Sequence, residues 1–179
     1  MKRDRISEGV YVFTSGLYAE VTATVIFTDE GAVLVDTLPF PQETRQIREF
    51  VNQRRTAVAY VVNSHSHADH IYGTYLFPEA VVVAHYQCRR LMERYAEGAL
   101  HQAKEQTPQL ADVQIRYPEL LFNDAMTLPI GAKTVELNYS PGHNRDVITV
   151  HVVEDRLMIA SDTVMPVPYI VGGDLDDLV

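Results

Sequence analysis

The stretch NSHSHADH, residues 63–70, places three of the chain's seven histidines and one carboxylate within six residues. It follows the apolar segment Val58–Val62 directly, and that segment has the composition of a buried strand. Neutral imidazoles and carboxylates are ligands that suit Zn²⁺, Fe²⁺ or Mn²⁺, and open α/β folds build their sites at strand ends. Without a metal, each crowded ring nitrogen would need another partner. The stretch predicts a metal site centred on His65, His67, Asp69 and His70 rather than a solvent-exposed histidine-rich loop.

Strand and helix patterns alternate on either side of this stretch. Apolar runs or alternating patterns predict strands at residues 10–13, 21–27, 32–35, 58–62, 80–84, 134–139, 147–152 and 157–160. Helical spacing predicts helices at residues 41–54, 71–76 and from 85 to about 95. Residues 97–121 have a weaker pattern, which we interpret as helix plus irregular connection. This stretch either folds over the site as a lid or lies apart from it. This order predicts an α/β fold.

Composition indicates one globular domain over residues 1–179, with 46% hydrophobic and 22% charged residues. No apolar run approaches the ~20 residues needed to span a bilayer, and no apolar signal core follows the basic residues 1–5. We therefore expect a cytoplasmic protein without a membrane partner. The single cysteine, Cys88, stands at helical spacing from Leu91 and Met92, which favours a core thiol over a nucleophile or ligand.

Charge disfavours nucleic acid as a partner. The formal net charge is −9, and the adjacent basic pairs past the N-terminus, Arg54-Arg55 and Arg89-Arg90, fall in helix-like segments. We expect both pairs on solvated helix faces. A small-molecule substrate fits this charge better than a polyanion.

Four segments together resemble the metallo-β-lactamase superfamily. Residues 65–70 match its His-x-His-x-Asp-His signature, and Val33–Thr37 resembles its strand that ends in an aspartate. Ser140–His143 is similar to its third-histidine motif, and Ile159–Thr163 to its strand before a bridging aspartate, with Ser161 where many members have glycine. Order and spacing agree from about residue 9 to residue 173. The resemblance implies an αββα sandwich of two mixed β-sheets flanked by helices, of the glyoxalase II or lactonase-like type, and is poorly specific for substrate.

Residue by residue, the resemblance implies two metal positions. His65, His67 and His143 would hold one metal, Asp69 and His70 would hold a second, and Asp162 would bridge them. Asp36 would orient a ligating imidazole. From the residues alone, His143 after Pro-Gly could be a turn residue and Asp162 a cap. Their joint placement with the cluster favours the metal site.

One feature departs from the family pattern. The family normally completes its second site with a further histidine near the C-terminus, but only His151 follows His143, within the expected strand at residues 147–153. Residues 172–174 look like a loop ending in a helix cap, and residues 175–179 like the first turn of a helix. We expect that the polypeptide continues past Val179, and that the C-terminal helix and strand of the domain are missing here.

The remaining candidate residues have mainly structural interpretations. His85 and His101 match no family position, and we expect a helix cap or surface role for them. Residues 15–18 form an early hairpin tip, expected to behave as a surface loop, although in similar proteins it can lean over the site. Residues 165–170 either line a pocket or pack a core edge.

These features predict a hydrolase in which one or two metal ions, Zn²⁺ or else Fe²⁺ or Mn²⁺, activate a hydroxide. Asp69 is expected as metal ligand and as proton acceptor or donor, and the substrate as a small ester, lactone or thioester. One alternative is a mononuclear iron persulfide dioxygenase that uses His65, His143 and Asp162. A second is an inactive metal-binding fragment, and a nuclease is a more distant third.

Overall fold

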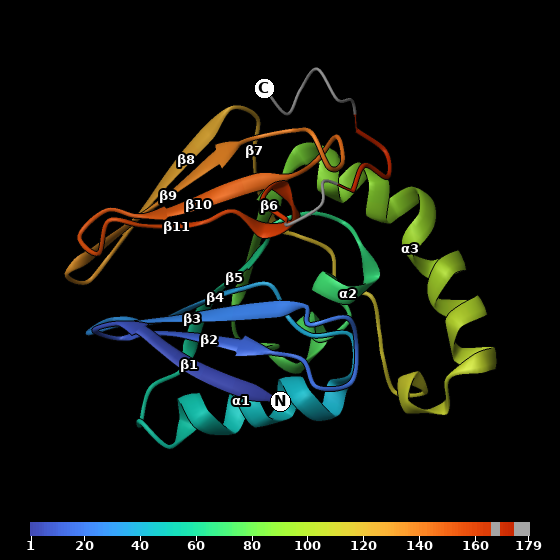
Figure 1. Ribbon diagram of the computed structural model, residues 1–179, viewed down its shortest axis with the longest axis horizontal. Helices are drawn as coiled ribbons and strands as arrows, with labels where there is room; N and C mark the ends of the chain where they lie inside the picture. Colours follow the sequence, from blue (N-terminus) through green and yellow to red (C-terminus); the bar gives the residue numbers. More distant parts are fainter. Residues whose placement is uncertain (166–168, 174–179) are drawn as a thin grey trace.

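Two stacked β-sheets form the centre of the protein in the computed structural model, which describes residues 1–165 and 169–173 (Figure 1). The first sheet has the order β1-β2-β3-β4-β5-β6-β7. Its strands are β1 (Lys2–Ser7), β2 (Val10–Thr14), β3 (Thr22–Thr28), β4 (Gly31–Val35), β5 (Val58–Asn63), β6 (Val81–His85) and β7 (Leu120–Phe122). Pairing is antiparallel from β1 to β4 and parallel from β4 to β7, so this sheet is mixed.

Helices connect the parallel strands, as parallel pairing requires a crossover. Helix α1 (Pro41–Asn52) joins β4 to β5. Helix α2 (Ala68–Ile71) and the 3₁₀ turn η1 (Thr74–Leu76) join β5 to β6. Helix α3 (Tyr86–Gln106) and η2 (Pro108–Leu110) join β6 to β7.

The second sheet has the order β11-β10-β9-β8 and ends at the 3₁₀ turn η3 (Ser161–Thr163). Its strands are β8 (Ala125–Ile130), β9 (Lys133–Tyr139), β10 (Ile148–Val152) and β11 (Leu157–Ile159). The α/β class and the two-sheet sandwich are confirmed. One detail differs from the expectation of two mixed sheets, because every pair among these four strands is antiparallel.

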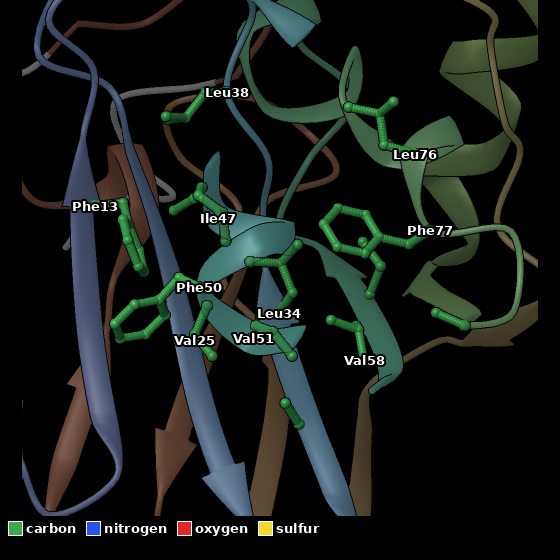
Figure 2. Packing of buried hydrophobic residues seen from close by; sticks show 14 of the residues in the cluster. Phe13, Val25, Leu34, Leu38, Ile47, Phe50, Val51, Val58, Leu76 and Phe77 are labelled. Atoms are coloured by element: carbon green, nitrogen blue, oxygen red, sulfur yellow. The ribbon is translucent and has the colours of Figure 1, made fainter. Parts of the chain in front are cut away.

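Two cores hold these layers together. Between the sheets, Val33 and Val62 of the first sheet pack with Leu137 and Val150 of the second, and all four are fully buried. On the outer face of the first sheet, Phe13, Val25 and Leu34 face Ile47, Phe50 and Val51 of α1 (Figure 2). No helix lies over the outer face of the second sheet in the part of the chain that the structure describes (Figure 1).

Helix α3 is longer than its sequence pattern indicated. It runs to Gln106, and its buried residues Cys88, Met92, Ala96 and Leu100 recur every four residues. With one buried residue in every four, the helix has few apolar residues on its buried face. Its amphipathic pattern is therefore weak after residue 97. Cys88 is fully buried, so the expectation of a core thiol is confirmed.

Several other sequence-based expectations need correction. Strands β1, β7 and β8 were not expected, because β1 is polar, β7 is three residues long and β8 contains Pro129. Helix α1 ends at Asn52 rather than at residue 54. Arg54 is exposed, as expected, but it follows the end of α1, and its guanidinium carbon lies 3.6 Å from the centroid of the Phe50 ring. No helix among the described residues is long and apolar enough to cross a bilayer.

Candidate metal centre

The site lies where β4, β5 and the second sheet end. Ile148 N donates to Ser64 O at 2.9 Å, and Ser66 N donates to the Asp146 carboxylate at 2.7 Å. These bonds join the turn after β5 to the loop that contains His143. The first histidines and the third are thus brought together from opposite sheets.

Four predicted ligands form one compact group. One ligand atom from each of His65, His67, His143 and Asp162 lies within 4.8 Å of the others. His67 Nδ1 is 3.0 Å from His65 Nε2 and 3.1 Å from His143 Nε2. Ligands of a tetrahedral zinc ion at ~2.0–2.1 Å would stand about 3.3 Å apart, so these three nitrogens have the spacing of a ligand set.

A second position adjoins this group. His70 Nε2 is buried and makes no hydrogen bond, yet it lies 3.5 Å from Asp162 Oδ1 and 3.8 Å from Asp69 Oδ2. The other oxygen of Asp162, Oδ2, lies 3.5 Å from His143 Nε2 and 3.8 Å from His65 Nε2. The two oxygens of Asp162 therefore face two separate sets of nitrogen atoms. This is the placement that a bridging carboxylate needs, and a cation beside His70 would give its orphaned nitrogen a partner.

A buried hydrogen-bond network orients the imidazoles. Asp36 accepts from His70 Nδ1 at 3.0 Å and from the Ser64 hydroxyl at 2.6 Å through one oxygen, and from Ser64 N at 2.7 Å through the other. The Ser64 hydroxyl lies 3.0 Å from His65 Nδ1 and 2.7 Å from the Ser161 hydroxyl. When a metal ion is bound and the proton stays on Nδ1, His65 and His70 would both turn an Nε2 lone pair toward the ion.

Two residues of this network have left-handed backbone angles. Asp36 has a φ of 58° and Ser161 a φ of 48°, and neither is glycine. Such a conformation costs about 1–2 kcal/mol for most residues, although Asp tolerates it better than Ser. The positive φ explains why glycine suits the position of Ser161, whereas the hydroxyl bonded to Ser64 is what serine adds there.

The other two imidazoles are held by the loop between β9 and β10 and by the segment after η3. His143 Nδ1 makes a short hydrogen bond to Tyr169 O, which leaves Nε2 free to face His67. His67 turns its Nε2 toward the side-chain amide of Asn144 at 3.2 Å. The hydrogen-bonding roles of Asn144, Tyr169 and Ser161 were not identified from the sequence, because partners of this kind have no motif of their own.

The acid–base properties follow from burial and crowding. Burial, and then the neighbouring His70, lowers the pKa of His65 well below 6.5, so this ring is neutral at pH 7. Burial and then His143 also lower the pKa of His67. For His70, burial is the largest effect and opposes the charged form, but the carboxylates of Asp36, Asp162 and Asp69 together outweigh it. Without a bound cation, the pKa of His70 is therefore raised well above 6.5. Burial likewise opposes ionisation of Asp162, yet the adjacent imidazoles of His70, His143 and His67 together hold its pKa below the usual value.

An open cavity of about 680 Å³ leads from solvent to the centre, and His67, Asp69, His143 and Asp162 line it. The segment Tyr18–Thr22 also lines it, so the hairpin tip, which is exposed as expected for a surface loop, borders the site. The tip is anchored at its base by buried Glu43 in α1, which accepts from the Ser15 hydroxyl at 2.6 Å and from Gly16 N at 2.9 Å.

The C-terminal segments were also singled out in the sequence. Met165 and Tyr169 line the same cavity. Of the two expectations for residues 165–170, lining a pocket is therefore the one that holds for these two residues. Residues 166–168 and the expected helical turn at 174–179 lie outside the described residues.

The remaining histidines lie apart from the centre. His85 is buried as the N-cap of α3, stacked on Tyr139 with 4.1 Å between ring centroids. His101 is on the exposed face of α3 near Glu105, and His151 pairs with Glu136 across β9 and β10. These contacts agree with the structural roles expected for His85 and His101.

The architecture defines the class as an α/β sandwich whose strand ends gather three histidines and an aspartate. The chain belongs to the metallo-beta-lactamase superfamily, whose sequence profile matches residues 19–177. None of the curated proteins that were compared with the chain matches it.

Solved structures show the same fold. A metallo-beta-lactamase from Pontibacter korlensis is 20% identical with a TM-score of 0.74, and the match covers 93% of this chain and 73% of that one. The structure of TMB-1, which is described in relation to substrate and inhibitor binding, is 16% identical with a TM-score of 0.75, over 99% and 79% of the two chains. A HARLDQ-motif mutant of a metallo-beta-lactamase from Cronobacter sakazakii is 18% identical with a TM-score of 0.67. That match covers 88% of this chain and 62% of the Cronobacter chain, so the protein spans less than two thirds of this neighbour.

Proposed function

We propose that the protein is a metal-dependent hydrolase of small esters, lactones or thioesters. The observation that carries the proposal is the group of His65, His67, His143 and Asp162 within 4.8 Å, at the wall of a cavity open to solvent. The chain's family and its fold support the same reaction type.

These residues define where metal ions would be held. His65, His67 and His143 would hold one ion, Asp69 and His70 a second, and Asp162 would contact both. Zn²⁺ fits a nitrogen-rich set with carboxylate, and Fe²⁺ or Mn²⁺ are the other ions that fit it. A bound cation of this kind lowers the pKa of a coordinated water toward neutrality and so supplies hydroxide at pH 7.

Asp69 is the residue best placed to move the proton. Its side chain is 26% exposed, lines the open cavity and reaches to 3.8 Å from His70 Nε2. In hydrolysis, the water oxygen bonds to the carbonyl carbon, the bond to the leaving oxygen or sulfur breaks, and the leaving group takes up a proton. Asp69 accepts the proton from water and delivers it to the leaving group.

The test combines metal analysis with turnover. We expect the purified protein to contain zinc and to hydrolyse 4-nitrophenyl acetate or a simple lactone, with activity lost on chelation and restored by Zn²⁺. Asp69→Asn should lower kcat by about 10²–10⁴-fold. His101→Asn, on the exposed face of α3, is the matched control and should not change kcat.

The iron alternative gives a different result. The dioxygenase would replace the hydrolase proposal if the protein contains one iron per chain, takes up oxygen with glutathione persulfide and hydrolyses neither esters nor lactones. Absence of bound metal and of both activities would favour the inactive fragment.

A further inference from the structure

We propose that the acyl half of the substrate is an apolar chain that ends in a carboxylate or phosphate, bound along α3 and paired with Arg90, Arg94 and Arg145. This inference rests on the proposed hydrolase function and adds the class of substrate. It is carried by a second cavity at the metal centre, which shares His67, Ala68 and Val171 with the open cavity that Asp69 lines.

The second cavity has a volume of about 460 Å³, within the range of small-molecule sites. Ser66, His67 and Asn144 line its inner end. Most of its other walls are apolar, from Ala68, Ile71, Leu91, Tyr95, Ala96 and Ala99. The segment at residues 169–173 passes beside the first half of α3 in Figure 1, and Val171 and Gly172 complete the walls. Such a cavity fits a hydrocarbon chain.

Three arginines stand at the outer end of this cavity. Arg145 and Leu91 also line an adjoining cavity of about 250 Å³, whose other residues are Gln87, Arg90 and Arg94. The two cavities share these two residues and are therefore neighbours. The path from His67 along α3 therefore leads to a cavity that Arg90, Arg94 and Arg145 line.

These arginines lack acidic partners. No ion pair joins Arg90, Arg94 or Arg145 to any residue that the structure describes, whereas Arg89 pairs with Glu93 at 2.7 Å and Arg116 with Glu119 at 3.0 Å. Like charges four residues apart on a helix repel each other, and Arg90 and Arg94 are so placed. In a chain with a net charge of −9, three arginines without an acidic partner among the described residues favour the binding of an anion.

The position of Asp69 decides which half of the substrate lies here. Asp69 lines the 680 Å³ cavity and does not line the 460 Å³ one. Because we assign Asp69 the protonation of the leaving group, the leaving group occupies the larger cavity. The acyl half then extends into the apolar cavity toward the arginines.

The test compares two esters that differ only at the far end of the acyl chain. These are 4-nitrophenyl octanoate and the mono-4-nitrophenyl ester of octanedioic acid. The native protein loaded with zinc should favour the anionic ester about tenfold in kcat/KM, mainly through KM, as expected for about 1.4 kcal/mol. Arg90→Gln/Arg94→Gln should abolish this preference, and raising the salt from about 0.05 M to about 0.5 M should reduce it in the native protein.

Two further measurements keep the result interpretable. Arg48→Gln, on the opposite layer in α1, is the control and should keep the preference, and circular dichroism melting shows whether each variant is folded. In the second measurement, calorimetric titration of the zinc-loaded protein compares octanamide with the half-amide of octanedioic acid. Tighter binding of the half-amide should disappear in the double variant.

The outcomes separate the two proposals. Equal turnover of both esters, or a preference that survives in the folded double variant, overturns the arginine site and leaves the hydrolase function in place. If the protein hydrolyses neither ester but still binds the half-amide more tightly than octanamide, the hydrolase function is overturned and the anion site is kept.

Discussion

Asp36 is the residue on which the orientation of two imidazoles depends. It bonds His70 directly and reaches His65 through Ser64, so one carboxylate fixes a ligand of each predicted metal position. It is 3% exposed and accepts three hydrogen bonds in a positive-φ conformation.

Asp36→Asn tests this role while it keeps the shape of the side chain and a tolerance for positive φ. An amide has one acceptor oxygen, so its NH₂ group must face a donor. We expect a loss of about 1–3 kcal/mol in the free energy of unfolding and about 10–100-fold weaker zinc binding. Chemical denaturation and a zinc competition titration measure the two effects, and unchanged zinc affinity would contradict the orienting role.

Among the helices and strands, α3 contributes residues to the wall of the cavity beside the site, so the position of this helix matters. Helix α3 depends at its start on His85, whose Nδ1 accepts from Gln87 N at 3.4 Å while Nε2 donates to Asn123 O at 2.5 Å. This arrangement requires a neutral ring. Burial is the main cause that lowers the pKa of His85 below 6.5.

The stability of α3 should therefore depend on pH. Because the pKa of His85 is lower in the folded state, the unfolded state binds more protons, and stability is lost as pH falls below about 6.5. His85→Asn keeps a capping acceptor but cannot titrate in this range. It should cost about 1–2 kcal/mol at pH 7.5, and the difference from the native protein should shrink as pH decreases.

Urea denaturation of both proteins across this pH range measures that difference. The other histidines are common to both proteins and cancel in the comparison. A constant difference from pH 7.5 to pH 5 would contradict a neutral capping histidine.

For the molecule as a whole, the centre joins loops from both sheets, so metal binding should stabilise the entire fold. A ligand that binds only the folded state adds about 2.7 kcal/mol at a concentration 100 times its Kd. We expect Zn²⁺ to raise the melting temperature of the native protein and of His101→Gln equally. His65→Ala/His143→Ala should lose this zinc-dependent increase, and a similar zinc-dependent increase in the double variant would place the metal elsewhere.

Several features of the fold were predictable because local patterns carry them. The alternation in residues 21–27 and the apolar run at 32–35 indicated β3 and β4, and the stripe of Ile47, Phe50 and Val51 indicated α1. Strands β1 and β8 were not predicted, because their residues show no strand pattern of their own. They form strands by pairing with β2 and β9.

The family, the α/β class and the residue types of the centre follow from the chain's local patterns, because His-x-His-x-Asp-His is contiguous in the chain. Folding in three dimensions brings His143 and Asp162 to that pattern and places Ser64, Ser161 and Tyr169 where they hold the rings. It alone placed Arg145 beside Arg90 and Arg94, at the end of an apolar cavity. The physical reason is that hydrogen bonds, burial and cavities depend on distances between segments far apart in the chain, and no local pattern records those distances.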